Sequence, residues 1–568
     1  MRKRLALFAA ALAAAGLLVG GVGTAADATS RWSSTVKGSD GTVYTATNHL
    51  TSAAFGAPRE WLLAWAGPAT PGAPDFLAVI DATPTSRSYG KVVNTVTMSP
   101  TTGNEPHHMQ YVWHKGQRIF AGGILSDSTY VFDSTQLPAL KLAGVNGPTD
   151  TPCGSLTDAF HVLSDGTAYA TFMGGPDVTG PCTYTNGETR IGNGMGGSPG
   201  EVVHMGRNGE TLAEIPVATK TGEDPQQCGN VPALPQATCA NPHGLAVRED
   251  LKRMITSDFA EARNFMTPDS PLEERLARQT VRIFDITDQN NPRLLNVSTL
   301  KTGPRAAQEP DPFFDETRVV MEAAVTNRPQ HKGAFVSTMA GGAIYYTPDI
   351  TAADPQWTEV FDDTAAYGSF SKDKSLTGGG DNSSWLMVSP DDRFLFHTVM
   401  GQSVPYGKPL DVTSGMIYVL DIQKLVGSGR PACNISELSE VYKGGKEHDC
   451  PELAGVMPIR DVTAGGPHWG TMDTFQADRH GNYRETDRIS RVAVANYFVA
   501  GSFGGGGDHR ICMADLDERG HVTLDRRFKD EKTGQPCVGF NRASWPHGDY
   551  GDSQPHGVLF AVSDRALR

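Results

Sequence analysis

Residues 388–396 have the sequence VSPDDRFLF, and this stretch is the clearest fold signal in the chain. Apolar residues flank a polar run, 390–393, in which proline and aspartate favour a turn. The pattern predicts two short strands joined by a tight polar turn. Two further stretches, VLSDGTAY at 162–169 and VREDLKRM at 247–254, show the same strand–turn–strand pattern.

A second recurring pattern is an apolar strand that ends in aspartate. It occurs as YVFD at 130–133, VRIFD at 281–285, IYVLD at 417–421 and ICMAD at 511–515. Long amphipathic helical patterns are scarce, so we expect an all-β protein. Irregularly spaced strand units of this kind predict a β-propeller with loop insertions. The competing interpretation is a protein of two β-sandwich domains.

Composition agrees with a loop-rich β protein, because the 568 residues include 63 glycines and 37 prolines. The formal net charge of −14 argues against nucleic acid or an anionic membrane surface as the main partner. No change in composition marks a linker. We therefore expect residues 29–568 to form a single propeller domain.

Residues 1–28 have the features of a secretory signal peptide. A basic start, Arg2-Lys3-Arg4, precedes an Ala- and Leu-rich run that ends near Val22, and Ala26-Asp27-Ala28 offers a cleavage site. An uncleaved anchor is the alternative, but the run is only moderately hydrophobic. No later segment is apolar enough to span a bilayer. We expect a secreted, extracytoplasmic protein with no membrane attachment once the signal is removed.

The eight cysteines agree with export, because an even number of cysteines in an exported chain predicts disulfides. Pairing between neighbours is the simplest of many connectivities. No CxxC motif is present, which argues against a cysteine zinc site. The neighbouring pairs are Cys153 with Cys182, Cys228 with Cys239, Cys433 with Cys450, and Cys512 with Cys537.

Histidines are the residues that point to chemistry. His107 and His108 are adjacent and follow Pro106. Side chains alternate along a strand, so both imidazoles reach one metal ion only where the backbone is irregular, which the proline favours. The alternative is a pair of surface histidines in a loop. A proline also precedes His243, His468 and His556, and His161 opens a further apolar run.

Propeller blades start their innermost strands near a central channel, where histidines from several blades would converge. Neutral imidazoles with few nearby thiolates suit copper, zinc or iron, and redox chemistry favours copper, with iron as the alternative. The leading candidate ligands are His107, His108, His161 and His556. His243 and His468 are candidates as ligands or as partners of ligands, and Glu105 is a candidate for orienting an imidazole. For each histidine the alternative is a structural role, and for Glu105 it is a plain loop carboxylate.

Several of these segments, in this order, resemble the selenium-binding protein / methanethiol oxidase family. The resemblance covers most of the mature chain discontinuously. It implies a seven-bladed propeller and, in the bacterial thiol oxidases, copper bound by histidines. The segments that carry it are Glu105 to His108, 123–126, 130–133, His161, His243, the turn at 389–395, and Gly465-Gly466-Pro467.

The chain also departs from the family pattern. The family's cysteine near the histidine pair has no counterpart, since residues 111–115 have the sequence YVWHK. Glutamine usually follows the Gly-Gly-Pro segment, where this chain has His468, and His556 is a loose counterpart of a C-terminal family motif. These departures argue against selenium binding and indicate a divergent exported branch whose substrate need not be methanethiol.

The sequence thus predicts a copper-dependent oxidase that acts on a small thiol or related sulfur compound, with oxygen as the acceptor. Two alternatives remain open. One is a non-catalytic propeller that binds metal or a partner, and the other is a four-histidine iron oxygenase.

Overall fold

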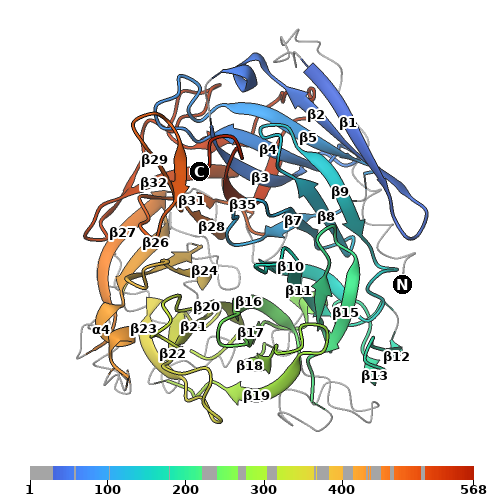
Figure 1. Cartoon of the computed structure of the whole chain (residues 1–568), viewed down its shortest axis with the longest axis vertical. Coiled ribbons are helices and arrows are strands. Elements are labelled where there is room, and N and C mark those ends of the chain that lie inside the picture. The colour runs from blue at the N-terminus through green and yellow to red at the C-terminus, as the bar shows by residue number, and fades with distance from the viewer. Residues whose placement is uncertain are drawn as a thin grey trace, which may run out of the picture.

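Seven β-sheets of four or more strands form a ring around a central axis in the computed structural model (Figure 1). The structure describes residues 30–56, 59–101, 103–177, 179–219, 240–265, 277–303, 316–363, 366, 383–400, 414–429, 433, 435, 449–460, 466–499 and 506–568. The innermost strands contact one another in chain order around the ring. This arrangement confirms the all-β propeller and excludes two sandwiches. The predicted signal peptide lies outside the described residues.

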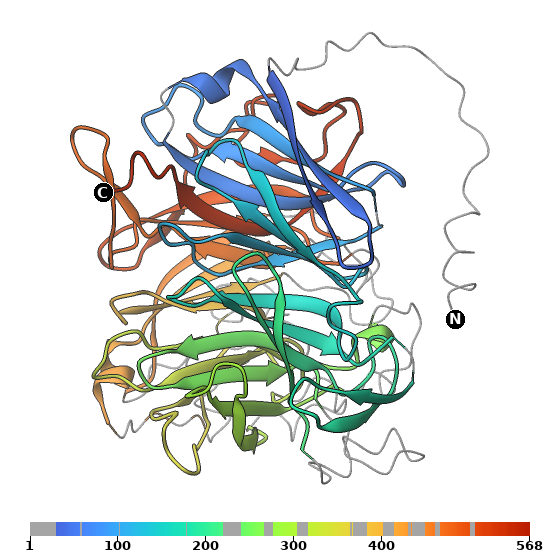
Figure 2. The same cartoon turned by 45° about the vertical axis from the view of Figure 1, so that its right-hand side comes forward.

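The first sheet contains the two ends of the described chain. Its innermost strand, β35, comes from the C-terminal region and pairs antiparallel with β3, which closes the ring (Figure 2). From the axis outward the strands are β35 (Ser553–Val562), β3 (Glu60–Pro68), β4 (Phe76–Asp81), β5 (Val92–Ser99), β2 (Val43–Leu50) and β1 (Ser30–Lys37).

The other six sheets follow in chain order, each written from the innermost strand outward. The second and third are β6 (Pro106–Met109), β7 (Ile119–Gly123), β8 (Ser128–Asp133) and β9 (Lys141–Asn146), then β10 (Ser155–Val162), β11 (Ala168–Gly174), β14 (Glu201–Met205) and β15 (Thr211–Pro216). The fourth and fifth are β16 (Pro242–Arg248), β17 (Arg253–Asp258), β18 (Thr280–Asp285) and β19 (Arg293–Thr299), then β20 (Val320–Val325), β21 (Ala334–Thr338), β22 (Ala343–Thr347) and β23 (Thr358–Asp362). The sixth is β24 (Ser383–Val388), β25 (Phe394–Val399), β26 (Ser414–Asp421) and β27 (Glu452–Arg460), and the seventh is β28 (Trp469–Met472), β31 (Arg491–Ala495), β32 (Arg510–Leu516) and β33 (Val522–Leu524).

Insertions and short helices complete the described chain. Two hairpins are inserted between blade strands, β12 (Gly180–Thr183) with β13 (Thr189–Gly192) and β29 (Phe475–Ala477) with β30 (Tyr483–Glu485), and β34 (Val538–Gly539) pairs with β32. The helices are η1 (Ser52–Phe55), α2 (Ala262–Phe265) and α4 (Gln423–Gly427). None of the described helices is long and apolar enough to cross a membrane.

The two sequence patterns occupy fixed positions in the blades. The three strand–turn–strand stretches connect the innermost strand to the second strand in the third, fourth and sixth sheets, and each Asp-ended stretch belongs to a third strand. The aspartates stop these strands by turning the chain: Asp133 and Asp285 each accept a hydrogen bond at 2.9 Å from the backbone N–H two residues on.

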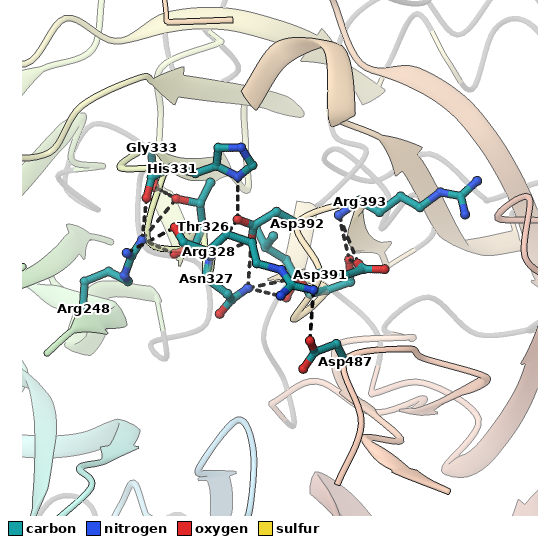
Figure 3. A network of polar contacts seen from close by, with 12 residues as sticks. Arg248, Thr326, Asn327, Arg328, His331, Gly333, Asp391, Asp392, Arg393 and Asp487 are labelled. Carbon is teal, nitrogen blue, oxygen red and sulfur yellow. Dashed lines mark hydrogen bonds and ion pairs between the residues drawn. The ribbon is translucent and has the colours of Figure 1, made fainter. Parts of the chain in front are cut away.

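The turn at 389–393 also joins neighbouring blades (Figure 3). Asp392 is buried, and its carboxylate accepts hydrogen bonds from the backbone N–H groups of Asn327 and Arg328, at 2.5 and 2.8 Å. The Asp392 oxygen that accepts from Arg328, Oδ2, also lies 2.8 Å from His331 Nδ1. The segment 326–333 follows β20, so one carboxylate fixes the fifth blade against the sixth.

Three disulfides link the predicted neighbours, Cys153 with Cys182, Cys433 with Cys450, and Cys512 with Cys537. The fourth predicted pair, Cys228 with Cys239, lies outside the described residues.

Two buried histidines away from the channel make the stability of the fold dependent on pH. The rings of His49, on β2, and His547, in the loop before β35, lie with centroids 5.9 Å apart. Burial is the main cause that lowers the pKa of His49 to about 4 and the pKa of His547 to about 3. Both values lie below the ordinary 6.5, so the fold contains neutral rings. Their contribution is complete above pH 6.5 and is lost as the pH falls toward 4 and 3.

We expect His547→Phe to reduce the pH dependence of the free energy of unfolding. Between pH 7.5 and 5, protonation of the unfolded chain at this residue costs the wild-type protein about 2 kcal/mol of stability, whereas phenylalanine binds no proton. Urea unfolding at the two pH values measures the difference. The exposed His480 provides the control, because His480→Gln should retain the wild-type dependence. A His547→Phe protein with unchanged pH dependence would contradict this explanation.

Candidate metal centre

Six of the seven innermost strands, as far as the structure describes them, contain a β-bulge at the same level of the channel. At each bulge, two residues of the innermost strand lie opposite one residue of its neighbour. In β6, Pro106 pairs with Gly123 and Met109 with Ala121, so His107 and His108 both lie opposite Gly122. A bulge bends the strand and changes the direction of its side chains. This irregularity explains how two adjacent histidines reach one site.

The bulges bring together polar side chains from six blades, and His468 adds one from the seventh; we call this group the channel cluster. Within their bulges, β10 carries Asp158, β16 carries His243, β20 carries Glu322 and β35 carries His556. His468 directly precedes β28, and Ser384 occupies the bulge of β24. The channel cluster therefore consists of His107, His108, Asp158, His243, Glu322, His468 and His556, with Ser384 beside it.

Asp158 lies at the centre of one half of the channel cluster. Its Oδ1 lies 2.9 Å from His107 Nε2 and 2.9 Å from His108 Nδ1. Its Oδ2 lies 3.3 Å from Nδ1 of His243, and the same nitrogen lies 3.5 Å from Glu322 Oε1. Tyr111 donates its hydroxyl hydrogen to the other oxygen of Glu322 at 2.6 Å.

Histidines alone form the other half. His108 Nε2 lies 3.1 Å from Nε2 of His468, and the Nδ1 of His468 lies 2.5 Å from the Ser384 hydroxyl oxygen. The ring of His556 has its centroid 4.0 Å from that of His107 and 4.7 Å from that of His468. Neither nitrogen of His556 has a hydrogen-bond partner among the described residues.

Every member of the channel cluster is at most 2 % exposed. Burial, followed by the neighbouring imidazoles, lowers the pKa of His108, His468 and His556 well below the ordinary value. Burial also raises the pKa of Glu322 well above its ordinary value. Neutral imidazoles present lone pairs, which is the form that binds a metal ion.

Aromatic rings cover the channel cluster. Trp469 stacks on His108 with centroids 3.9 Å apart, Phe259 stacks on His243 at 5.1 Å, and Phe498 lies edge-on to His468 at 4.7 Å. All three rings are buried. Such surroundings exclude water and strengthen electrostatic interactions inside the site.

The residues present fit a metal ion. Buried polar atoms normally have hydrogen-bond partners. Both ring nitrogens of the buried His556 have none among the described residues, and a bound metal ion would account for this. Two groups have ligand atoms that all lie within 4.8 Å of one another: His107, His108, Asp158 and His243, and His108, His468 and His556. Several imidazoles with one carboxylate suit copper, zinc or iron.

The structure brings five of the six candidate histidines together and places the sixth elsewhere. His161 lies three residues after Asp158 on β10 and lines a cavity of about 170 Å³ near the other ends of the innermost strands. Burial lowers the pKa of His161 to about 4, but it belongs to neither group of the channel cluster. Glu105 accepts a hydrogen bond from the Tyr497 hydroxyl, and the ring of Tyr497 lies edge-on to His556 with centroids 5.7 Å apart.

Sequence reasoning missed Asp158, Glu322 and Ser384. No proline precedes these residues, so the pattern that found the histidines does not include them. Their common signal is a polar residue near the start of an innermost strand: Asp158 is the fourth residue of β10, Glu322 the third of β20 and Ser384 the second of β24. That signal becomes specific only when the register of all the blades is known.

Neither a family model nor a curated protein sequence matches the chain. Among solved structures it is similar to a hypothetical selenium-binding protein from Sulfolobus tokodaii, with a TM-score of 0.55 and 15% identity over 90% of this chain and 95% of that chain. It is also similar to a periplasmic gluconolactonase from Pseudomonas aeruginosa, with a TM-score of 0.46 and 11% identity over 89% and 99%. A putative 6-phosphogluconolactonase from Bacteroides uniformis is similar with a TM-score of 0.44 and 13% identity, over 89% of this chain and 100% of that chain. At 15% identity, the similarity to the Sulfolobus tokodaii protein shows a shared fold alone.

Proposed function

We propose that the chain is a copper-dependent oxidase of a small thiol or related sulfur compound, with oxygen as the acceptor. The observation that carries the proposal is the buried channel cluster, in which imidazoles from four blades meet and Asp158 joins them in one group of ligand atoms. The resemblance of the sequence segments to methanethiol oxidases supports the substrate class. The three disulfides support a site of action outside the reducing cytoplasm.

A bound copper ion would supply the redox chemistry, since it can accept electrons from a thiol and pass them to oxygen. With methanethiol, one C–H and one S–H bond would break as a C=S bond forms, and oxygen would take up the two electrons and two protons to form hydrogen peroxide. The protein side chains perform the other tasks. The imidazoles provide neutral ligand atoms, Asp158 provides a compensating negative charge, and Trp469, Phe259 and Phe498 keep water away.

A second candidate function is that of an iron oxygenase. The specific observation in its favour is Asp158, because two histidines and one carboxylate are the typical ligands of non-haem iron. Copper and iron differ in their electron paramagnetic resonance spectra, so the two candidates are separable in one preparation.

Metal analysis of the purified full chain, followed by oxygen uptake with methanethiol, tests the proposal. We expect copper to be retained after dialysis and oxygen uptake to depend on both copper and thiol. Less than about 0.2 metal ion per chain after reconstitution would contradict a metal centre. Retained copper without thiol-dependent oxygen uptake would instead indicate a non-catalytic metal-binding propeller.

A further inference from the structure

His108 differs from the other histidines of the channel cluster because both of its ring nitrogens face potential ligands. Its Nδ1 lies 2.9 Å from Asp158 Oδ1, and its Nε2 lies 3.1 Å from His468 Nε2. The ring is fully buried, and its face stacks on Trp469. The stacking fixes the plane of the ring, so the two nitrogens are held toward opposite halves of the channel cluster.

Two neighbours of His108 each direct one nitrogen at one half of the channel cluster. His468 Nδ1 contacts the Ser384 hydroxyl, which leaves Nε2 directed at His108. His243 Nδ1 lies 3.3 Å from Asp158 Oδ2 and 3.5 Å from Glu322 Oε1. Partners of this kind fix the orientation of an imidazole and determine which nitrogen binds metal. Each of these two histidines thus offers one nitrogen, to one half of the channel cluster only.

The geometry points to a centre for two metal ions, with the imidazole of His108 as the bridge between them. We propose that His107, Asp158 and His243 bind one ion with Nδ1 of His108, and that His468 and His556 bind the second with Nε2. This proposal rests on the proposed metal-dependent function. A ring that binds through both nitrogens carries no N–H, so His108 releases that proton to solvent when the second ion binds.

The two halves differ in chemistry. The first contains the only carboxylate of either group, whereas the second consists of imidazoles alone. Negative charge from Asp158 therefore compensates the first ion more directly than the second. Oxygen donors also favour harder ions, so the first position is the less selective of the two for copper.

Copper loading tests the two-ion centre without any measurement of activity. We expect the full chain, loaded with Cu(II) and freed of excess metal, to retain about two copper ions. An imidazole bridge couples the two unpaired electrons, so the paramagnetic resonance signal should correspond to only a small fraction of the copper present. His556→Phe should retain about one copper ion per chain and recover a full single-copper signal.

Matched variants distinguish the possible results. Asp158→Asn keeps the shape of the side chain and should weaken the first ion, whereas His114→Gln changes an exposed histidine and should retain both. Circular dichroism establishes that each variant is folded. One copper ion in the wild-type protein would overturn the two-ion centre and leave the proposed function standing, and no copper would overturn both. Two ions with the full signal of independent spins would overturn the bridge.

Discussion

Replacement of His108 by phenylalanine is expected to remove metal from the channel cluster almost completely. His108 belongs to both groups of ligand atoms, so its loss leaves neither group intact. Phenylalanine has a similar flat ring that can stack on Trp469, so the fold should persist. We expect metal content below about 0.2 ion per chain and a fall of at least about 100-fold in thiol-dependent oxygen uptake. Metal analysis and an oxygen electrode measure the two effects.

His114 provides the control for this experiment. It follows His108 closely in the sequence, but its side chain is exposed and lies 2.8 Å from Glu485. His114→Gln should keep both metal and oxygen uptake. If His108→Phe retained wild-type metal content, the channel cluster would not be the metal centre.

Replacement of Arg491 by alanine is expected to have the largest effect on stability. Arg491, on β31, lies 2.7 Å from Glu60 Oε1 and 2.6 Å from Asp473 Oδ2, and it donates a hydrogen bond to the Ala82 carbonyl at 2.9 Å. These contacts join the seventh blade to the first. The alanine variant leaves two buried carboxyl groups without their cation. Removal of one partner from a buried ion pair costs about 3–5 kcal/mol, which should appear in urea unfolding.

Arg488 allows a direct comparison, because its guanidinium also contacts a carboxylate, on Glu518, but both side chains are more than four-fifths exposed. Exposed ion pairs contribute little to stability, so Arg488→Ala should leave the unfolding midpoint nearly unchanged. Equal effects of the two substitutions would show that burial does not determine the stabilisation by Arg491.

The fold was predictable where a local sequence feature produces a local structure. The turn at 389–393 and the aspartates that end third strands act within a few residues, so they are visible in the sequence. The first sheet gave no such signal. Its innermost strand, β35, pairs with β3 from the opposite end of the described chain, and no local pattern encodes that pairing.

The candidate site was partly predictable for a physical reason. Proline precedes the bulge in β6, β16 and β35, so a histidine that follows proline lies at the bulge. In β10 the bulge falls at Asp158 and Ala159, after Thr157 instead of proline. The apolar run that begins at His161 therefore led to the strand that carries Asp158, but to a residue three positions after it.

Closure of the ring by β35 determines when the all-histidine group of the channel cluster becomes complete. This strand follows every other strand in chain order, and it also carries His556. The all-histidine group is therefore incomplete until β35 has paired with β3. Under the proposed function, a metal ion can therefore occupy the all-histidine group only after the whole blade sequence has been synthesised and the ring has closed.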